Sequence, residues 1–232
     1  MKKPIIGIIG KVQPQYGEDI WHRIDEVDEI RYLIVKNGGT AITLLPTEPT
    51  LKFNDNDIKD DTVLTEEEKI ELYRQIDLCD GFVLQGGLYS SQYEIEMAKR
   101  IVELDKPLIG ICAGFNNILR AIGTDVNLDE MKSHDFYDKN YRHKISVVKG
   151  TKMYDMIGKD EYYVNSIHSM IAPKENVEGF ATISSTSEDG LVESFELKDN
   201  KFVIGVKWHP ELMLEDGFAD RLFTELVEKS GE

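Results

Sequence analysis

The stretch KPLIGICAGFNNIL, residues 106–119, is the clearest indication of the fold, because a strand-like run and a helix-like run meet in it at one cysteine. The continuous apolar run Pro107–Ile111 predicts a buried parallel strand, and helix-compatible spacing resumes from about Gly114. Cys112 stands at the break, with Gly110 and Gly114 on either side. A sharp strand-to-helix turn favours glycines, because β-carbons nearby would obstruct it. The stretch therefore predicts a strand, a tight turn that carries Cys112, and a helix.

Apolar runs of the same kind recur through the first half of the chain, and helix-like segments alternate with them. The runs that predict further parallel strands are Pro4–Ile9, Thr40–Leu45 and Gly81–Leu84. The segments with apolar residues at helical spacing are Glu26–Lys36, ended by Gly38-Gly39; Glu66–Asp77, opened by a Thr65/Glu68 capping box; and Gln92–Leu104. This alternation predicts an α/β fold with a doubly wound sheet.

The second half of the chain has a different pattern. After residue 140, short strand-like runs follow one another closely, with turn signals such as Glu188-Asp189-Gly190 between them. The runs are HKISVV, YYVNSIHSMIA, FATISST, LVESFEL and FVIGVKWHP. They predict a smaller patch of antiparallel or mixed strands, and Asp216–Lys229 predicts a closing amphipathic helix. In the first half, four aspartates in Asp55–Asp61 predict a solvated loop.

Length and composition exclude several classes of function. A chain of 232 residues predicts one domain over 1–232. The net charge of −16 repels phosphate backbones and anionic membranes, so we expect no nucleic-acid or membrane partner. No apolar run approaches the roughly 18–20 residues that span a bilayer, and MKKPIIGIIGKVQ does not read as a signal peptide, so we expect a cytoplasmic protein. Cys79 and Cys112 form no CxxC motif, so nothing predicts a zinc or redox site.

The position of Cys112 suits a nucleophile. A residue between a parallel strand and the next helix lies at the carboxyl end of the sheet, where α/β proteins bind ligands. The helix dipole and its unpaired N–H groups lower a thiol pKa from about 8.5, which favours the reactive thiolate. The alternative is a small buried hydrophobe in a tight turn, and this stretch alone leaves both open.

Acyl transfer by a thiolate also needs a proton shuttle and donors for the oxyanion. His209 follows the apolar run FVIGVKW, and Glu211 comes two residues later, where its carboxylate can hold the imidazole. The run GFVLQGG ends with Gly86 and Gly87, whose amides no side chain obstructs, and Ala113 supplies a second N–H. Each signal is weak alone, since loop histidines and paired glycines are common.

Taken together, GFVLQGG, PLIGICAGFN and GVKWHPE resemble, in this order, the class I glutamine amidotransferases. More narrowly, the chain is similar to the γ-glutamyl-γ-aminobutyrate hydrolase family over nearly its whole length. The further motifs that carry this similarity are KPIIGI, NGGTAITLLP, a histidine-led strand at His143, YYVNSIHSM and EDGLVESFE. The resemblance implies a flavodoxin-like three-layer sandwich with a mainly parallel central sheet.

The resemblance also implies a set of site residues, and it implies neither a cofactor nor a metal. The triad would be Cys112, His209 and Glu211, with the N–H groups of Gly87 and Ala113 as the oxyanion hole. The residues that would bind substrate, or support the pocket, are Gly86, Asn116, Asn165, Ser166 and His168. For Asn165, Ser166 and His168, a hydrogen-bonded loop packed beside the turn is an equal alternative.

The chain departs from the family pattern at several positions. Ala113 replaces the usual Arg, Asn116 the common Gln, and Met170 the Gln that more often ends NSIHSM. The glycine pair lacks the usual aspartate and insertion, since GGLYSSQYE runs directly into a predicted helix. These departures leave the substrate less defined than the reaction type.

The leading hypothesis is a hydrolase that cleaves the γ-amide of a small γ-glutamyl compound through a γ-glutamyl thioester. One alternative is a glutaminase subunit that supplies ammonia to a separate synthetase, and another is a non-catalytic binding protein. A homodimer is compatible with all three. The candidates for holding the substrate carboxylate are Arg120, Lys132, Arg142 and Lys207.

Overall fold

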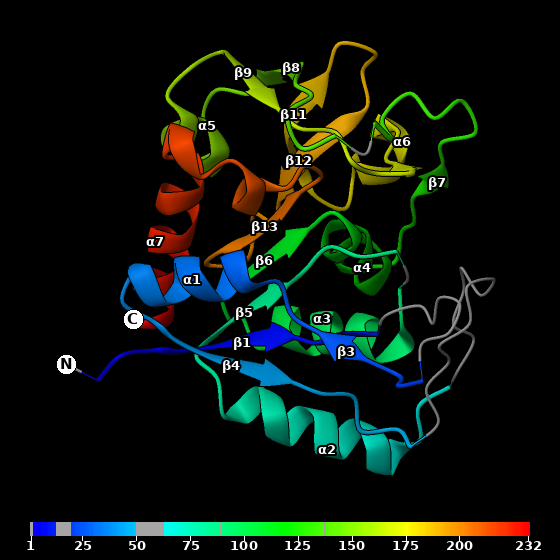
Figure 1. Cartoon of the computed structure of the whole chain (residues 1–232), viewed down its shortest axis with the longest axis vertical. Coiled ribbons are helices and arrows are strands. Elements are labelled where there is room, and N and C mark those ends of the chain that lie inside the picture. The colour runs from blue at the N-terminus through cyan, green and yellow to red at the C-terminus, as the bar shows by residue number, and fades with distance from the viewer. Residues whose placement is uncertain (1, 13–19, 50–62, 89, 137) are drawn as a thin grey trace.

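A single continuous sheet forms the centre of the chain. The computed structural model describes residues 2–12, 20–49, 63–88, 90–136 and 138–232, so the loop expected at Asp55–Asp61 lies outside the described residues. Within those ranges the sheet has nine strands in the order β4-β1-β5-β6-β13-β12-β11-β8-β9. Figure 1 shows this order running from β4 at the bottom to β9 at the top.

The first part of this order, here called the parallel half, runs parallel throughout. Its strands are β4 (Thr40–Leu44), β1 (Ile5–Ile9), β5 (Gly81–Leu84), β6 (Leu108–Ile111) and β13 (Val203–Val206). The strands β5, β6 and β13 are buried at every position, as continuous apolar runs predict for strands covered on both faces. The parallel strands predicted from these runs are confirmed.

The rest of the sheet, here called the antiparallel half, continues from β13 without a break. Its strands are β12 (Val192–Glu196), β11 (Thr182–Ser187), β8 (His143–Val147) and β9 (Glu161–Val164). The predicted antiparallel patch is therefore confirmed, as an extension of the main sheet. Two short ribbons lie outside the sheet: β2 (Lys11–Val12) pairs with β3 (Ile24–Asp25), and β7 (Asn127–Leu128) with β10 (Met170–Ile171).

Helices cover both faces of the sheet and complete a three-layer sandwich. One face packs against α1 (Asp28–Lys36), α5 (Lys152–Ile157) and α7 (Phe218–Ser230), with α1 and α7 side by side in Figure 1. The other packs against α2 (Glu66–Asp77), α3 (Gln92–Glu103), α4 (Ala113–Ala121) and α6 (Lys174–Val177). Two 3-10 turns, η1 (Pro210–Leu212) and η2 (Leu214–Asp216), precede α7. The described part of the chain contains no helix that could cross a bilayer.

The sequence features that predicted the ends of helices in the first half of the chain are present in the structure. The α2 bounds coincide with the prediction, and the Thr65/Glu68 capping box is formed. Gly38 has a φ of +94°, the left-handed conformation that ends α1. The stripe predicted for α2 is only partly buried, because Ile70 is exposed. The short helices α5 and α6 were not predicted.

The order of the parallel strands determines where the loops meet. The strand β6 lies between β5 and β13, with Gly110 opposite Leu84 and Ile111 opposite Val206. Since all three strands point the same way, the segments after them meet at the carboxyl edge of the sheet. Those segments are the glycine pair after β5, Cys112 after β6, and His209 after β13.

Candidate active site

The turn after β6 holds Cys112 in a strained conformation. Its φ of +50° and ψ of −100° lie outside the regions that L-residues favour, at a cost of about 1–3 kcal/mol. The flanking glycines permit this close turn. A β-carbon on Gly114 would lie 2.0 Å from the Leu84 carbonyl oxygen, and one on Gly110 would lie 2.7 Å from the Gly114 oxygen. The cysteine is therefore presented by backbone packing that only glycine allows.

His209 and Glu211 lie beside this cysteine. His209 Nδ1 is 2.7 Å from Glu211 Oε1, and the imidazole lies close enough to the Cys112 sulfur for each group to shift the pKa of the other. Cys112 is 8% exposed, and the side chain of Glu211 is 2% exposed. The structure thus brings together three side chains separated by about a hundred residues of sequence, in the order sulfur, imidazole, carboxylate.

The charges in this row of groups reinforce one another. Burial alone would raise the pKa of the Cys112 thiol, but His209, with a contribution from Lys207, lowers it overall. Burial alone would lower the pKa of His209, yet the Glu211 carboxylate and the Cys112 sulfur raise it well above its ordinary value. The arrangement favours a thiolate beside an imidazolium, which is the reactive form of a cysteine nucleophile.

Asn165 fixes the backbone of His209. Its Nδ2 donates to the His209 carbonyl at 2.8 Å, and its Oδ1 accepts from the His209 N–H at 2.9 Å. Asn165 is fully buried and directly follows β9, so it connects the two halves of the sheet. The sequence left open whether Asn165 binds substrate or belongs to a hydrogen-bonded loop beside the turn, and its contacts in the structure are those of such a loop.

Gly86, the first of the glycine pair, lies against the imidazole. A β-carbon on Gly86 would lie 2.5 Å from His209 Cε1 and 3.4 Å from Cys112 Cβ. The backbone after β5 therefore approaches the sulfur and the imidazole to a distance that excludes any side chain. This is the place expected for oxyanion donors.

Gly87, the second of the two glycines, packs against a buried ion pair. A β-carbon there would lie 2.5 Å from Lys11 Cε, and Lys11 Nζ is 2.6 Å from Glu94 Oε1. These two side chains are 2% and 1% exposed. The sequence analysis missed this pair, although the Ser91/Glu94 capping box that opens α3 was a readable signal for Glu94.

Asn116 lies on α4 and contacts a buried lysine. Lys207 Nζ donates to Asn116 Oδ1 at 2.5 Å and lies 4.8 Å from the centre of the Phe115 ring. Burial lowers the pKa of Lys207 to about 8. Among the four basic candidates, Lys207 alone affects the pKa of Cys112.

The other basic candidates have different surroundings. Arg120 pairs with Asp125 at 2.8 Å, and Arg142 lies 3.6 Å from Glu215. Lys132 is exposed and has a φ of +52°. Lys207 is therefore the candidate that the geometry favours for an anionic substrate group near the sulfur.

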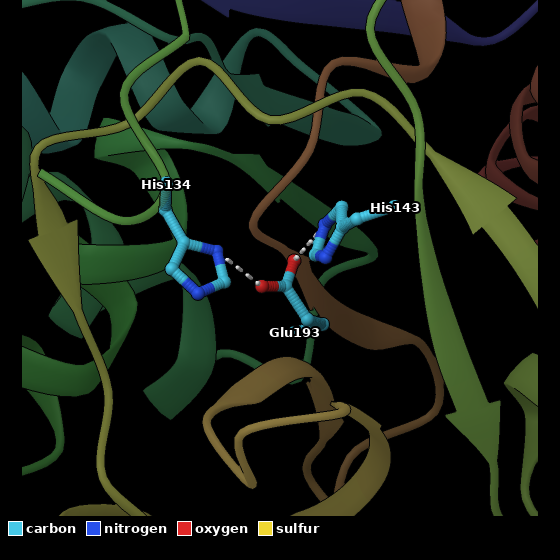
Figure 2. A group of neighbouring side chains, drawn as sticks. All are labelled: His134, His143 and Glu193. Carbon is cyan, nitrogen blue, oxygen red and sulfur yellow. Dashed lines mark ion pairs between the residues drawn. The ribbon is translucent and has the colours of Figure 1, made fainter.

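His168 belongs to a neighbouring histidine cluster, defined here as His134, His143, His168 and Glu193, and Ser166 contacts it. Ser166 Oγ donates to the His134 carbonyl at 2.7 Å, and His168 Nδ1 lies 3.1 Å from the Met170 carbonyl. Figure 2 shows the rings of His134 and His143 on either side of the Glu193 carboxylate. The sequence analysis did not predict this cluster, whose clearest signal was a carboxylate within the buried run LVESFEL.

The comparisons with known proteins agree with this geometry. Residues 89–211, more than half of the chain, match the family model described as Peptidase C26. A glutamine amidotransferase-like protein of Lactococcus lactis is 24% identical over 234 residues, covering 96% of this chain and 97% of its own. One from Rickettsia prowazekii is 37% identical over 89 residues, covering 38% of this chain. That match covers 31% of the Rickettsia protein, so this chain spans about a third of that relative's length.

The fold has close counterparts among solved structures. The glutaminase domain of Trypanosoma brucei CTPS, solved with bound acivicin, superposes with a TM-score of 0.64 at 11% identity. The superposition covers 98% of this chain and 94% of that domain. The expected class I glutamine amidotransferase-like fold is confirmed.

Proposed function

Because the chain belongs to the Peptidase C26 family, we propose that it is a cysteine-dependent hydrolase of the γ-amide bond in γ-glutamyl compounds. The family and the glutamine amidotransferase-like relatives support an amide hydrolase or glutaminase activity. The observation that carries the proposal is the row formed by the Cys112 sulfur, the His209 imidazole and the Glu211 carboxylate.

In the first half of the reaction, the Cys112 thiolate attacks the γ-carbonyl carbon and forms the carbon–sulfur bond. His209 then gives its proton to the leaving nitrogen as the carbon–nitrogen bond breaks. The amine departs and a γ-glutamyl thioester remains on Cys112. Glu211, 2.7 Å from Nδ1, keeps the imidazole in the tautomer and orientation that this transfer needs.

In the second half, His209 takes a proton from a water molecule, and the resulting hydroxide attacks the thioester carbonyl. The carbon–sulfur bond breaks, which releases glutamate and restores the thiolate and imidazolium. No further reactant is needed for atoms and charge to balance.

The oxyanion of both tetrahedral intermediates is assigned to the N–H groups of Gly87 and Ala113. Ala113 is the first residue of α4, so the helix itself does not use its N–H. Removing one such donor typically lowers kcat about 10²–10³-fold. Both donors are backbone groups, which explains why Ala113 can replace another residue type without loss of the chemistry.

The γ-glutamyl head group is assigned to a position beside Lys207 and Asn116. A buried ammonium is the complement that a substrate carboxylate needs in so acidic a protein. Asn165, Ser166 and His168 support this position from the segment after β9. Gly86 leaves room for the substrate carbonyl between the imidazole and the sulfur.

The decisive experiment compares the two cysteines. Purified chain, Cys112→Ala and Cys79→Ala are each given a panel of γ-glutamyl amides and, separately, a glutamine-like chloroketone. Cys79 is the matched control, because it is also buried and burial raises the pKa of its thiol to about 11. We expect hydrolysis and covalent labelling in the parent and Cys79→Ala, and neither in Cys112→Ala. Hydrolysis by Cys112→Ala at the parent rate would refute the mechanism.

A glutaminase that serves a separate synthetase is the second candidate. The likeness to the glutaminase domain of Trypanosoma brucei CTPS favours it. This candidate predicts weak release of ammonia from glutamine by the chain alone and stimulation by a partner. Release of substituted amines from γ-glutamyl amides, at rates that no partner changes, would decide for the stand-alone hydrolase. A chain that neither hydrolyses nor labels would be the non-catalytic binding protein.

A further inference from the structure

The histidine cluster surrounds one buried carboxylate. Glu193 Oε1 lies 3.5 Å from His134 Nδ1 and 3.7 Å from His168 Nε2, and Oε2 lies 3.9 Å from His143 Nε2. The side chain of Glu193 is 1% exposed, and those of His134 and His168 are 5% and 3% exposed. Figure 2 shows the rings of His134 and His143 turned toward this carboxylate.

Four polar atoms of this cluster lack hydrogen bonds. Among the residues that the structure describes, neither oxygen of Glu193 has a hydrogen-bond partner, and neither does Nε2 of His143 or of His168. A buried carboxylate without a hydrogen-bond partner carries a desolvation penalty of several kcal/mol, which the nearby Lys207 ammonium offsets only in part. A cation bound beside this carboxylate would offset that penalty.

The outer contacts of His134 and His168 show which of their nitrogens carries a proton. His134 Nε2 is 2.9 Å from Asp189 Oδ2, and a carboxylate can only accept, so Nε2 holds the hydrogen. His168 Nδ1 is 3.1 Å from the Met170 carbonyl and must likewise donate. When these two imidazoles are neutral, the opposite nitrogens carry lone pairs that face Glu193, and His134 Nδ1 also lies 3.4 Å from Ser166 Oγ. Histidines that bind metals are oriented in this way, with the second ring N–H held by a carboxylate or a carbonyl.

We propose that His134 Nδ1, His143 Nε2 and the Glu193 carboxylate bind a divalent transition-metal ion, with Zn²⁺ the best match. The ligand atoms of these residues lie within 4.8 Å of one another. A tetrahedral Zn²⁺ with bonds of about 2.0–2.2 Å holds its ligands roughly 3.3–3.6 Å apart, so small side-chain rotations close the site. Imidazole nitrogens select Zn²⁺, Co²⁺ or Fe²⁺ over the oxygen-binding Mg²⁺ and Ca²⁺.

The metal would act as a clamp within the antiparallel half. His143 begins β8 and Glu193 lies in β12, whereas His134 comes from the loop between β7 and β8. The neighbouring Ile167 carbonyl lies 3.8 Å from the Cys112 sulfur. A bound ion would thus fix the segment that forms one wall beside the cysteine. Asp189, which contacts His134 from outside the cluster, has a side chain that is 48% exposed.

The test measures Zn²⁺ binding to the untagged full chain carrying Cys112→Ser, a change that removes the reactive thiol as a competing ligand. Equilibrium dialysis is expected to give one Zn²⁺ per chain, and Co²⁺ to give the visible absorption of a tetrahedral nitrogen and oxygen site. Zn²⁺ should also raise the midpoint of thermal unfolding. Absence of stoichiometric binding would overturn the proposal, and the cluster would then be held by a proton or water.

Substitutions in and around the histidine cluster identify the residues that bind the ion. In the Cys112→Ser background, Glu193→Gln should abolish binding, and Asp189→Asn should weaken it about 10- to 100-fold through the second contact of His134. Asp189 is partly exposed, so Asp189→Asn decides the matter if Glu193→Gln does not fold. The controls are His22→Gln, at an exposed histidine outside the cluster, and Asp199→Asn, in the turn after β12. Binding left unchanged by Asp189→Asn, or lost equally in the controls, would contradict the site. The result is independent of hydrolytic activity.

Discussion

The two halves of the sheet bury their carboxylates differently. In the parallel half, Glu94 lies 2.6 Å from Lys11 Nζ, and Glu211 at the carboxyl edge lies 2.7 Å from His209 Nδ1. In the antiparallel half, Glu193 faces His134, His143 and His168 at 3.5 to 3.9 Å. The first two carboxylates are paired at short distance within the chain, whereas neither oxygen of the third has a hydrogen-bond partner among the described residues.

This difference separates two kinds of site. Short contacts between paired charges keep a proton-handling group in one orientation, which acyl transfer requires. Longer spacings between lone pairs leave room for an ion, which a metal site requires. Asn165 and Lys207 lie at the boundary, since the first joins the segment after β9 to His209 and the second stands near both Cys112 and Glu193.

The largest effect is expected from breaking the short contact between Glu211 and His209. Glu211→Gln keeps the shape of the side chain but removes the charge that orients the imidazole. We expect kcat on a γ-glutamyl amide to fall about 10³–10⁴-fold with little change in KM. The control is Glu215→Gln, at an exposed carboxylate in the following turn, and a comparable loss there would show that the effect is not one of orientation.

The next effect concerns the space between the glycine pair and the imidazole. Gly86→Ala places a β-carbon 2.5 Å from His209 Cε1, so the ring must move. We expect kcat to fall about 10²-fold, because displacement of a catalytic group by about 1 Å has this cost. Gly231→Ala is the matched control, since its β-carbon would make an ordinary contact at 3.4 Å. Full activity of Gly86→Ala would mean that the imidazole does not need its present position.

Asn165→Ala tests the connection between the two halves. The change removes two hydrogen bonds to the His209 backbone, each worth about 0.5–1.5 kcal/mol. We expect kcat to fall about 10-fold while KM stays nearly constant. Asn176→Ala removes a side-chain bond to the Asp125 carbonyl far along the chain and serves as control. A rise in KM with unchanged kcat would make Asn165 a substrate contact instead.

The smallest effect is expected from Lys207→Gln. Lys207 contributes to the lowered pKa of Cys112, so removing its charge should raise that pKa. The rate of Cys112 alkylation at pH 6 should then fall about threefold, because less thiolate is present. Lys144→Gln, on the far strand β8, is the control. An unchanged rate would show that His209 alone sets the thiolate fraction.

The parallel half was predictable because its signals are local. Strands such as Gly81–Leu84 are continuous apolar runs, the capping box fixes the start of α2, and Gly110 and Gly114 mark the turn around Cys112. Each of these features depends on a few neighbouring residues. The fold class was therefore predictable from the sequence alone, without knowledge of the tertiary contacts.

The convergence of the site was predictable only through resemblance to a family. Cys112 and His209 come together because β6 and β13 are neighbours in the sheet, and no local pattern states which strands will pair. The histidine cluster illustrates the limit. Its members come from segments around residues 134, 143, 168 and 193, and only the pairing of the antiparallel strands places them around one carboxylate.

The most direct test of the central claim is the pH dependence of Cys112 alkylation by iodoacetamide, in the parent chain and in His209→Ala. The His209 imidazole holds the pKa of the Cys112 thiol below its ordinary value. The rate in the parent should therefore stay high as pH falls below the ordinary thiol pKa, and in His209→Ala the profile should shift to higher pH. A parent rate that rises only at the pH of an ordinary thiol, with the same profile in His209→Ala, would contradict the account.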